Sequence, residues 1–163
     1  MQRKEEDVMA RIQGKELRKF DQVNRMSLPP KYKRMLGDEI IMFKPLQHEP
    51  CVMLFSESSW DDFYENILEN FEGEAQAEAE RRLADRSDVV IPDKSNRITV
   101  RDDFMAFAGL TDEVLAVGVG DRVEFWNPQK WEECHRGEKS KKVSDEDFFS
   151  GVSYARPRSK KNT

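Results

Sequence analysis

The pattern Asp-x-x-Asn-Arg occurs twice in this chain of 163 residues, as DQVNR at Asp21–Arg25 and as DKSNR at Asp93–Arg97. Each shared residue recurs 72 positions later, since 21 is matched by 93, 24 by 96 and 25 by 97. An Asp that opens a turn can accept hydrogen bonds from backbone N–H groups a few residues later. Asn tolerates the left-handed conformation that most side chains avoid. The pattern therefore predicts a tight turn at both places, with positive φ at Asn24 and Asn96.

The arginine that ends each pattern could do more than support a turn. Arg25 and Arg97 each follow a turn directly, and each guanidinium can pair with the turn aspartate, Asp21 or Asp93. The same group can also reach a phosphate or the edge of a guanine base. The residues alone leave both interpretations open: an ion pair that braces the hairpin, or a cation that binds nucleic acid.

The elements that must position these turns also repeat along the chain. Hydrophobic periodicity and turn residues predict the order strand, turn, strand, helix, strand, strand, helix, and then the same order again. The expected strands are 15–20, 25–29, 39–46, 51–56, 88–91, 97–100, 113–120 and 122–127, and the expected helices are 29–36, 59–71, 74–86, 101–110 and 128–137. Ser59 is the expected N-cap of the helix at 59–71. Each half is too short to enclose much core, so we expect the halves to interlock.

Charge is segregated along the chain. The net charge is −5, yet the stretch from Glu57 to Glu80 holds nine acids and no base. Bases crowd the first hairpin instead: Arg18, Lys19, Arg25, Lys31, Lys33 and Arg34. Segregation of this kind can leave one positive face on an acidic protein.

Other chemistry has little support in the sequence. Cys134 and His135 are adjacent and His48 is the only other histidine, a spacing that does not build a tetrahedral metal site. We expect reduced cysteines, no metal, no cofactor and no enzymatic activity. No apolar run approaches the ~18 residues of a membrane helix, and the N-terminal residues lack the apolar segment of a secretion signal. The sequence therefore predicts a cytoplasmic protein.

The first half resembles MraZ proteins, bacterial transcriptional regulators related to the AbrB family. In GKELRKFDQVNRMSLPPKYK, the family's spaced Gly, Asp, Arg and Pro are matched by Gly14, Asp21, Arg25 and Pro29. FAGLTDEVLAVGVGDRVEFWNPQKWEE is similar to the second half of the family, and CVMLFSESSWDDF to its central strand and helix start. The resemblance covers about residues 14–133.

Several residues depart from the family pattern. Asn24 and Asn96 replace turn glycines, and Val23 and Ser95 stand where the family has a turn lysine. Arg101 stands where the family usually has proline.

The resemblance implies an α+β fold in which tandem swapped-hairpin, AbrB-like modules interlock into one small β-barrel with flanking helices. The implied parts are an N-terminal extension (1–13), a first AbrB-like module (14–58), a helical connector (59–86), a second AbrB-like module (87–136) and a disordered basic tail (137–163). The family forms ring homo-oligomers and binds double-stranded DNA at tandem promoter repeats of the division and cell-wall gene cluster. We therefore expect a nucleoid-associated repressor.

The resemblance also suggests roles for single residues. Arg25 and Arg97 would read bases or enter a groove, while Asp21, Asn24, Asp93 and Asn96 would support the turns. The remaining candidate DNA-binding residues are Lys31, Lys33, Arg34 and Arg101. The acidic helical pair, 59–86, should face away from bound DNA. Two alternatives remain: a scaffold of the same fold that has lost DNA binding, and an AbrB-like antitoxin module, which usually carries one hairpin per chain.

Overall fold

The computed structural model describes residues 11–46, 49–136 and 142–154. The chain divides into two compact units, Met1–Lys130 and Trp131–Thr163. The first unit holds both β-sheets, and the second holds most of helix α6 and all of α7. Most of the N-terminal extension, His48 and the end of the basic tail lie outside the described residues.

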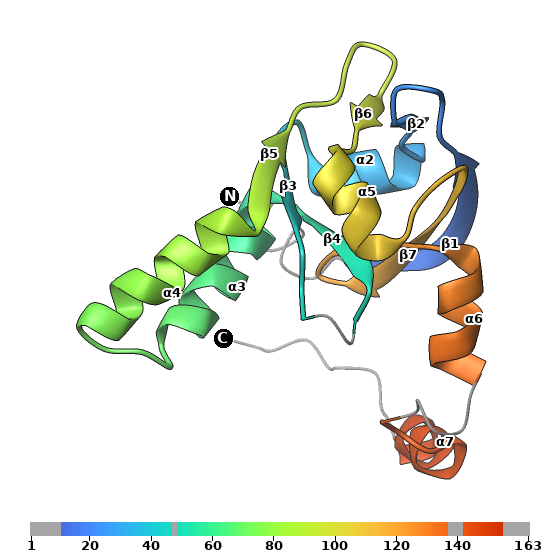
Figure 1. The fold of residues 1–163 in the computed structure, drawn as a ribbon. Coiled ribbons are helices and arrows are strands. Elements are labelled where there is room, and N and C mark those ends of the chain that lie inside the picture. The colour runs from blue at the N-terminus through green and yellow to red at the C-terminus, as the bar shows by residue number, and fades with distance from the viewer. Residues whose placement is uncertain (1–10, 47–48, 137–141, 155–163) are drawn as a thin grey trace, which may run out of the picture. The chain divides into compact units, whose positions relative to one another are not determined.

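The order of elements predicted from the sequence is confirmed, and it repeats once (Figure 1). The first half contains β1 (Ile12–Lys19), β2 (Arg25–Ser27), α2 (Pro30–Leu36), β3 (Ile40–Phe43), β4 (Cys51–Phe55) and α3 (Glu57–Leu68). Helix α4 (Glu74–Asp85) leads into the second half. That half contains β5 (Ser87–Val90), β6 (Arg97–Thr99), α5 (Asp102–Ala108), β7 (Glu113–Gly120), β8 (Val123–Trp126) and α6 (Pro128–Arg136).

The two halves exchange strands in the larger sheet. Its order is β1-β7-β8-β4-β3-β5, and all neighbours are antiparallel. Strand β1 of the first half pairs with β7 of the second, and β5 of the second half pairs with β3 of the first. The order therefore reads the same from either edge once each strand is replaced by its counterpart in the other half.

Strands β2 and β6 form a separate two-stranded ribbon. The described strands thus form a six-stranded sheet and this ribbon, whereas the family resemblance implied one closed barrel. The physical reason lies in the turns. Two backbone bonds close each turn: Asp21 N–H to Arg25 O and Asn24 N–H to Asp21 O in the first, and the equivalent bonds of Asp93 and Asn96 in the second. The chain then leaves its preceding strand and pairs with the corresponding strand of the other half.

The register of the ribbon separates a buried face from an exposed one. Met26 pairs with Ile98 at its centre, and both side chains are buried. Side chains alternate along a strand, so the flanking residues of the ribbon point the other way. These flanking pairs are Arg25 with Thr99 and Ser27 with Arg97.

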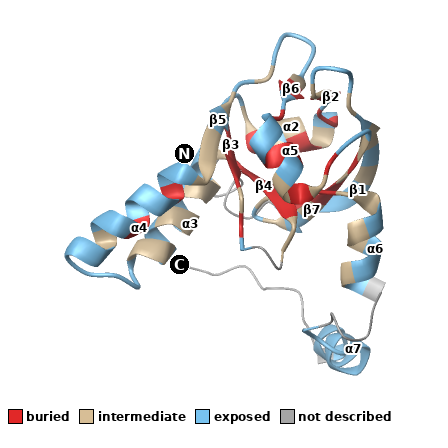
Figure 2. Cartoon of the chain, viewed as in Figure 1, coloured by how far each residue is buried: buried red, intermediate tan, exposed pale blue. Residues whose placement is uncertain are grey.

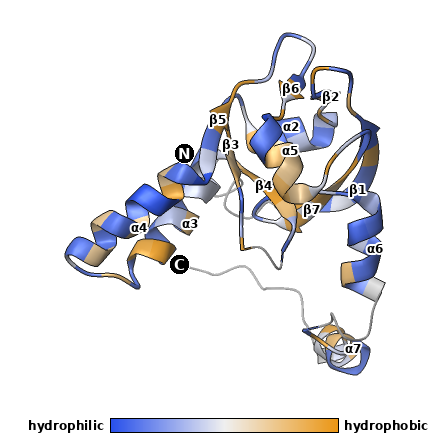
Figure 3. Cartoon of the chain, in the orientation of Figure 1, coloured by the Kyte–Doolittle hydropathy of each residue, from blue (hydrophilic) through white to orange (hydrophobic). Residues whose placement is uncertain are grey.

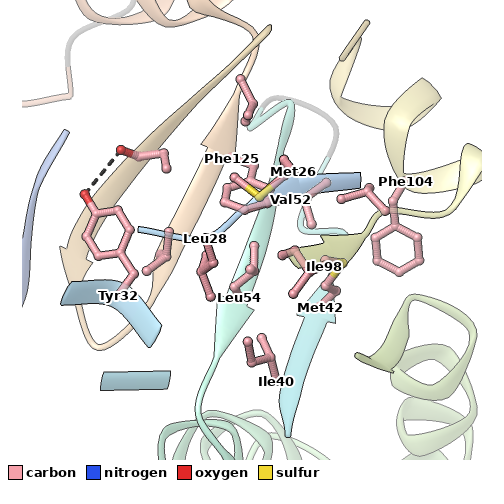
Figure 4. Packing of buried hydrophobic residues seen from close by; sticks show 14 of the residues in the cluster. Met26, Leu28, Tyr32, Ile40, Met42, Val52, Leu54, Ile98, Phe104 and Phe125 are labelled. Carbon is pink, nitrogen blue, oxygen red and sulfur yellow. Dashed lines mark hydrogen bonds between the residues drawn. The ribbon is translucent and has the colours of Figure 1, made fainter. Parts of the chain in front are cut away.

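The hydrophobic core lies beneath this ribbon. Met26 and Ile98 pack in one cluster with Val52, Leu54 and Phe125 of the large sheet (Figure 4). Helices α2 and α5 contribute to the same cluster, and the strands β3, β4 and β8 are buried along their whole length (Figure 2). A single shared core therefore holds the ribbon in place from both halves.

Tyr32 attaches helix α2 to the exchanged strands. Its phenol O–H lies 2.6 Å from the Gly14 carbonyl of β1 and 3.3 Å from the Ala116 carbonyl of β7 (Figure 4). Burial is the main cause that raises the pKa of Tyr32, so the phenol keeps its proton and can donate. The helix that carries Lys31, Lys33 and Arg34 is thereby fixed to a strand pair made of both halves.

Two local expectations were wrong. The N-cap of α3 is Ser56, whose hydroxyl accepts a hydrogen bond from the Ser59 N–H, because the helix begins directly after β4. The tail expected to be disordered contains α7 (Asp145–Tyr154). Ser144 caps this helix by accepting from the Asp147 N–H at 3.0 Å, and three acids occupy its first turn, where the helix dipole favours them.

Candidate nucleic-acid interface

The first turn is organised by the carboxylate of Asp21. Its Oδ1 accepts hydrogen bonds from the backbone N–H groups of Val23 and Arg25, both at 2.9 Å. Its Oδ2 accepts a third bond from Arg25 Nε at 2.8 Å. Asn24 adopts φ 62°, so the positive φ predicted from the sequence is confirmed. One carboxylate thus fixes both the backbone of the turn and the base of the arginine side chain.

The second turn repeats this arrangement. Asp93 accepts from the N–H groups of Ser95 and Arg97 at 2.8 and 2.9 Å, and from Arg97 Nε at 2.9 Å. Asn96 has φ 60°, which also confirms the prediction. The same geometry arises from different residues at the second and third positions, so it depends on the shared Asp, Asn and Arg.

The geometry allows each arginine to brace its turn by an ion pair and, at the same time, to offer a cation to nucleic acid. Arg25 and Arg97 brace their turns through Nε alone, and each side chain is 40% exposed. Within the described part of the chain, the terminal Nη1 and Nη2 groups of both arginines have no hydrogen-bond partner. Each guanidinium is therefore held in place by one edge and presents its other donors to solvent.

The hydrogen bonds also tune the two carboxylates. The Arg25 backbone N–H is the largest cause that lowers the pKa of Asp21, and the Arg97 backbone N–H does the same for Asp93. Bonds from the side chain of each arginine act in the same direction. Both aspartates are consequently ionised at neutral pH, which is the state that accepts all three bonds.

The exposed face of the ribbon contains further polar groups that the sequence did not single out. Ser27 and Thr99 lie beside Arg97 and Arg25 in the register and are exposed. Lys94 is exposed in the second turn and forms no ion pair within the described residues. Lys94 could have been chosen as a candidate cation because it lies inside the DKSNR pattern. The family pattern places its turn lysine one position later, at Ser95, so Lys94 was not among the residues predicted from the sequence.

The basic residues of α2 differ in their availability. Lys31 pairs with Glu16 of β1 at 3.2 Å, and Lys33 pairs with Asp38 at 2.9 Å. Arg34 is exposed and has no ion-pair partner among the residues that the structure describes. All three belong to a helix that starts just after the ribbon, but only Arg34 offers an uncompensated charge.

Arg101 forms more ion pairs within the described residues than the other candidate residues do. Its Nε and Nη2 donate to both carboxylate oxygens of Asp103 at 3.0 and 2.9 Å, and its Nη1 lies 3.2 Å from Asp88. The Asp103 carboxylate is the largest cause that raises the pKa of Arg101, and Arg101 in turn lowers the pKa of Asp103. The charge of Arg101 is therefore compensated within the fold, and its DNA role remains a prediction.

The chain was compared with known proteins. The family model described as "MraZ protein, putative antitoxin-like" matches residues 87–149. A protein of Paenarthrobacter aurescens named "Transcriptional regulator MraZ" is 31% identical over 131 residues, which cover 79% of this chain and 89% of the relative. Proteins of the same name from Micrococcus luteus (30% identity, 82% and 94% covered) and Leifsonia xyli (30% identity, 70% and 79% covered) are similarly close.

This chain belongs to the MraZ family. MraZ proteins are transcriptional regulators and not enzymes, as the sequence led us to expect. The described residues contain no group of three or more side chains that could hold a metal ion. None of the described helices has the length and apolar character needed to cross a membrane.

The acidic helices of this MraZ protein lie apart from the two turns. Both turns project from the same end of the first unit, whereas α3 and α4 extend from the opposite side of the sheet (Figure 1). Helix α4 consists mainly of hydrophilic residues, whereas α3 is mixed (Figure 3). Helix α3 packs on the sheet through an aromatic cluster in which its Trp60 and Phe63 contact Phe43 and Phe55 of the strands. The predicted separation of the acids from the arginine face is therefore present.

Proposed function

We propose that this protein is a transcriptional repressor that binds double-stranded DNA through the outer face of the β2–β6 ribbon and its two turns. The observation that carries the proposal is the state of Arg25 and Arg97. Each is oriented by an Nε bond to its turn aspartate and keeps its terminal donors exposed. A guanidinium with two free parallel donors suits the O6 and N7 acceptors of guanine or a phosphate.

The shape and chemistry of the ribbon support this proposal. A two-stranded ribbon fits into the major groove of B-form DNA. The outer face of this ribbon has only polar side chains, Arg25, Ser27, Arg97 and Thr99, while its inner face is anchored in the core. Arg34 and Lys94 are exposed cations suited to phosphate contacts, and Lys31 and Lys33 can add to them when DNA competes with their exposed acidic partners.

The proposal extends to the assembly. The exchange of β1 and β5 between halves is what two interlocked swapped-hairpin modules would require. We propose that such subunits form a ring that binds tandem promoter repeats upstream of the division and cell-wall gene cluster, on the nucleoid in the cytoplasm. The names of the relatives, "Transcriptional regulator MraZ", support a regulatory role at a promoter.

A binding assay with single-arginine variants tests the proposal. Fluorescence anisotropy with the promoter DNA upstream of the protein's own gene should show that Arg25→Ala and Arg97→Ala each abolish tight binding. Arg82→Ala is the matched control, since it removes an equally charged, 77% exposed side chain from α4, away from the ribbon. Circular dichroism should show that all three variants remain folded. Unchanged binding by both ribbon variants would contradict the proposal.

A scaffold of the same fold without DNA binding is the second candidate. Val23 and Ser95 favour it, because they remove a cation from each turn relative to the family pattern. Under this alternative the wild-type protein would form an oligomer of defined size but bind none of the promoter fragments. Size-exclusion chromatography with light scattering, carried out on the samples used for the binding assay, separates the two candidates.

A further inference from the structure

The two turns share one backbone but present different side chains at their tips. Gln22 and Val23 of the first turn correspond to Lys94 and Ser95 of the second. Val23 is 58% exposed although it lies in a segment whose backbone is fixed by the bonds to Asp21. An apolar, β-branched side chain is thus exposed to water at the tip of a polar loop whose backbone is fixed by hydrogen bonds.

The fold does not require valine at this position. Ser95 occupies the equivalent place, and its N–H bonds to Asp93 at 2.8 Å, as the Val23 N–H bonds to Asp21 at 2.9 Å. Exposed aliphatic residues are common on proteins and by themselves indicate nothing. Val23 differs from other exposed aliphatic residues because the second turn has the same backbone hydrogen bonds with a serine at this position. The turn conformation therefore does not depend on valine.

We infer that Val23 is a specificity residue that contacts the 5-methyl group of a thymine in the major groove. The inference rests on the proposed function, and it follows from the chemistry of the groove. Base edges there offer hydrogen-bond donors and acceptors, and the thymine methyl is their one apolar substituent. Val23 lies two residues before Arg25, so a base next to the one read by this arginine is within reach of its methyl groups.

The second turn is built for a different contact. Lys94, Ser95 and Asn96 are all exposed, and their side chains have no hydrogen-bond partner within the described residues. In the first turn, by contrast, Asn24 Nδ2 already donates one hydrogen bond to Asp102 Oδ1 at 2.7 Å. The first turn therefore offers an apolar tip and the second a cationic, hydrogen-bonding tip. The two halves would read unequal half-sites, and each subunit would bind its site in one direction only.

Removal of single methyl groups from the DNA tests this inference. The probe is a duplex selected from random-sequence DNA by the wild-type protein, in which each thymine is replaced in turn by deoxyuridine. One replacement should weaken wild-type binding about fourfold, the effect expected for loss of one buried methyl contact. The Val23→Ser protein, which gives the first turn the tip residue of the second, should bind the thymine and deoxyuridine duplexes equally. Ser95→Val is the matched control and should keep the wild-type dependence at that thymine.

The possible outcomes separate this inference from the proposed function. If wild-type binding is insensitive to every deoxyuridine replacement, or if Val23→Ser keeps the same sensitivity, the role of Val23 is wrong while DNA binding stands. If selection yields no bound duplex at all, both the proposed function and the inference fail. Thermal unfolding of Val23→Ser should match the wild type, because Ser95 shows that the turn accommodates serine.

Discussion

The carbonyl oxygen of Asn24 accepts a hydrogen bond of 2.9 Å from the backbone N–H of Val100, in the other half of the chain. The reciprocal bond joins the Leu28 N–H to the Asn96 carbonyl, also at 2.9 Å. Each turn is therefore bonded to the residue directly after the strand that follows the opposite turn. The asparagines with positive φ, Asn24 and Asn96, thus link each turn to the other half of the chain. A substitution at either asparagine should therefore affect the conformation of both turns.

Substitutions at Asn96 should reveal the backbone requirement. Asn96→Gly should change the free energy of unfolding by less than ~0.5 kcal/mol, because glycine adopts positive φ freely and Asn96 makes no side-chain bond within the described residues. Asn96→Val should destabilise by ~1–2 kcal/mol, since a β-branched side chain is strained at φ 60°. Urea denaturation followed by tryptophan fluorescence measures both values.

The first turn should respond differently. Asn24→Gly also loses the bond to Asp102, so it should cost about 0.5–1 kcal/mol more than Asn96→Gly. Thr99→Val is a suitable control, because it places a β-branched residue at an exposed position of strand β6, where extended backbone accepts it. Equal effects of valine at positions 96 and 99 would contradict the role of positive φ.

The turns could be predicted from the sequence because their cause is local. Asp21, Asn24 and Arg25 interact within five residues, so the residue pattern contains the geometry. The order of the elements is local for the same reason, since it depends on periodicity and turn residues. The sequence accordingly predicted the hydrogen bonds from backbone N–H groups to the turn aspartates. It also indicated the Asp–Arg ion pair as one of two interpretations of the arginines.

Contacts between distant segments could not be predicted in this way. The partner of β2 is β6, and no local pattern distinguishes this pairing from a closed barrel. The ion pair of Arg101 with Asp88 and the hydrogen bond from Asn24 to Asp102 depend on the position of the first residues of α5 in the folded chain. Likewise, the sequence contains several serines near the start of α3, and only the end of β4 determines that Ser56 is the cap.

Replacement of arginine by lysine tests the double use of the guanidinium. Arg25→Lys keeps the positive charge, but its single nitrogen cannot bond Asp21 and contact DNA with two further donors at once. We therefore expect Arg25→Lys to weaken DNA binding nearly as much as Arg25→Ala, as measured by anisotropy. Arg34→Lys should have little effect, since Arg34 makes no oriented contact within the described residues and would serve as a charge near phosphate. Near wild-type affinity of Arg25→Lys would show that charge alone suffices.

Acid should loosen the turns. Asp21 and Asp93 have pKa values below their ordinary value of 3.8 in the folded chain. A lowered pKa means that the carboxylates contribute stability above pH 3.8, and that this contribution is lost as the pH falls below that value through the folded-state pKa. The Asp21→Asn and Asp93→Asn variants should thus be less stable than the wild type at neutral pH and approach it in acid. Melting temperatures measured across this range check the prediction, and a constant difference between variant and wild type would refute it.

Repeated sites should matter more than the strength of one site. A single ribbon offers two arginines and a few further cations, so binding to one repeat should be modest and strongly dependent on salt. If subunits form a ring, a second repeat meets a ribbon already held nearby, and apparent affinity can rise ~10²- to 10⁴-fold. Gel shifts on one, two and three repeats measure this rise, and spacers of half a helical turn should remove it. A wild-type protein that binds one repeat as well as three would rule out the avidity mechanism.

The reciprocal pairing of β1 with β7 and β5 with β3 has a consequence for the symmetry of the target. A homodimer built from one hairpin per chain must present two identical turns about a true twofold axis, so it is suited to palindromic DNA. Here both hairpins belong to one polypeptide, so the residues of one turn can change without a change in the other. The shared core still keeps the two halves in their reciprocal arrangement. The chain therefore has the architecture of a symmetric dimer without requiring a symmetric target, and under the proposed function we expect it to bind tandem repeats that all have the same orientation.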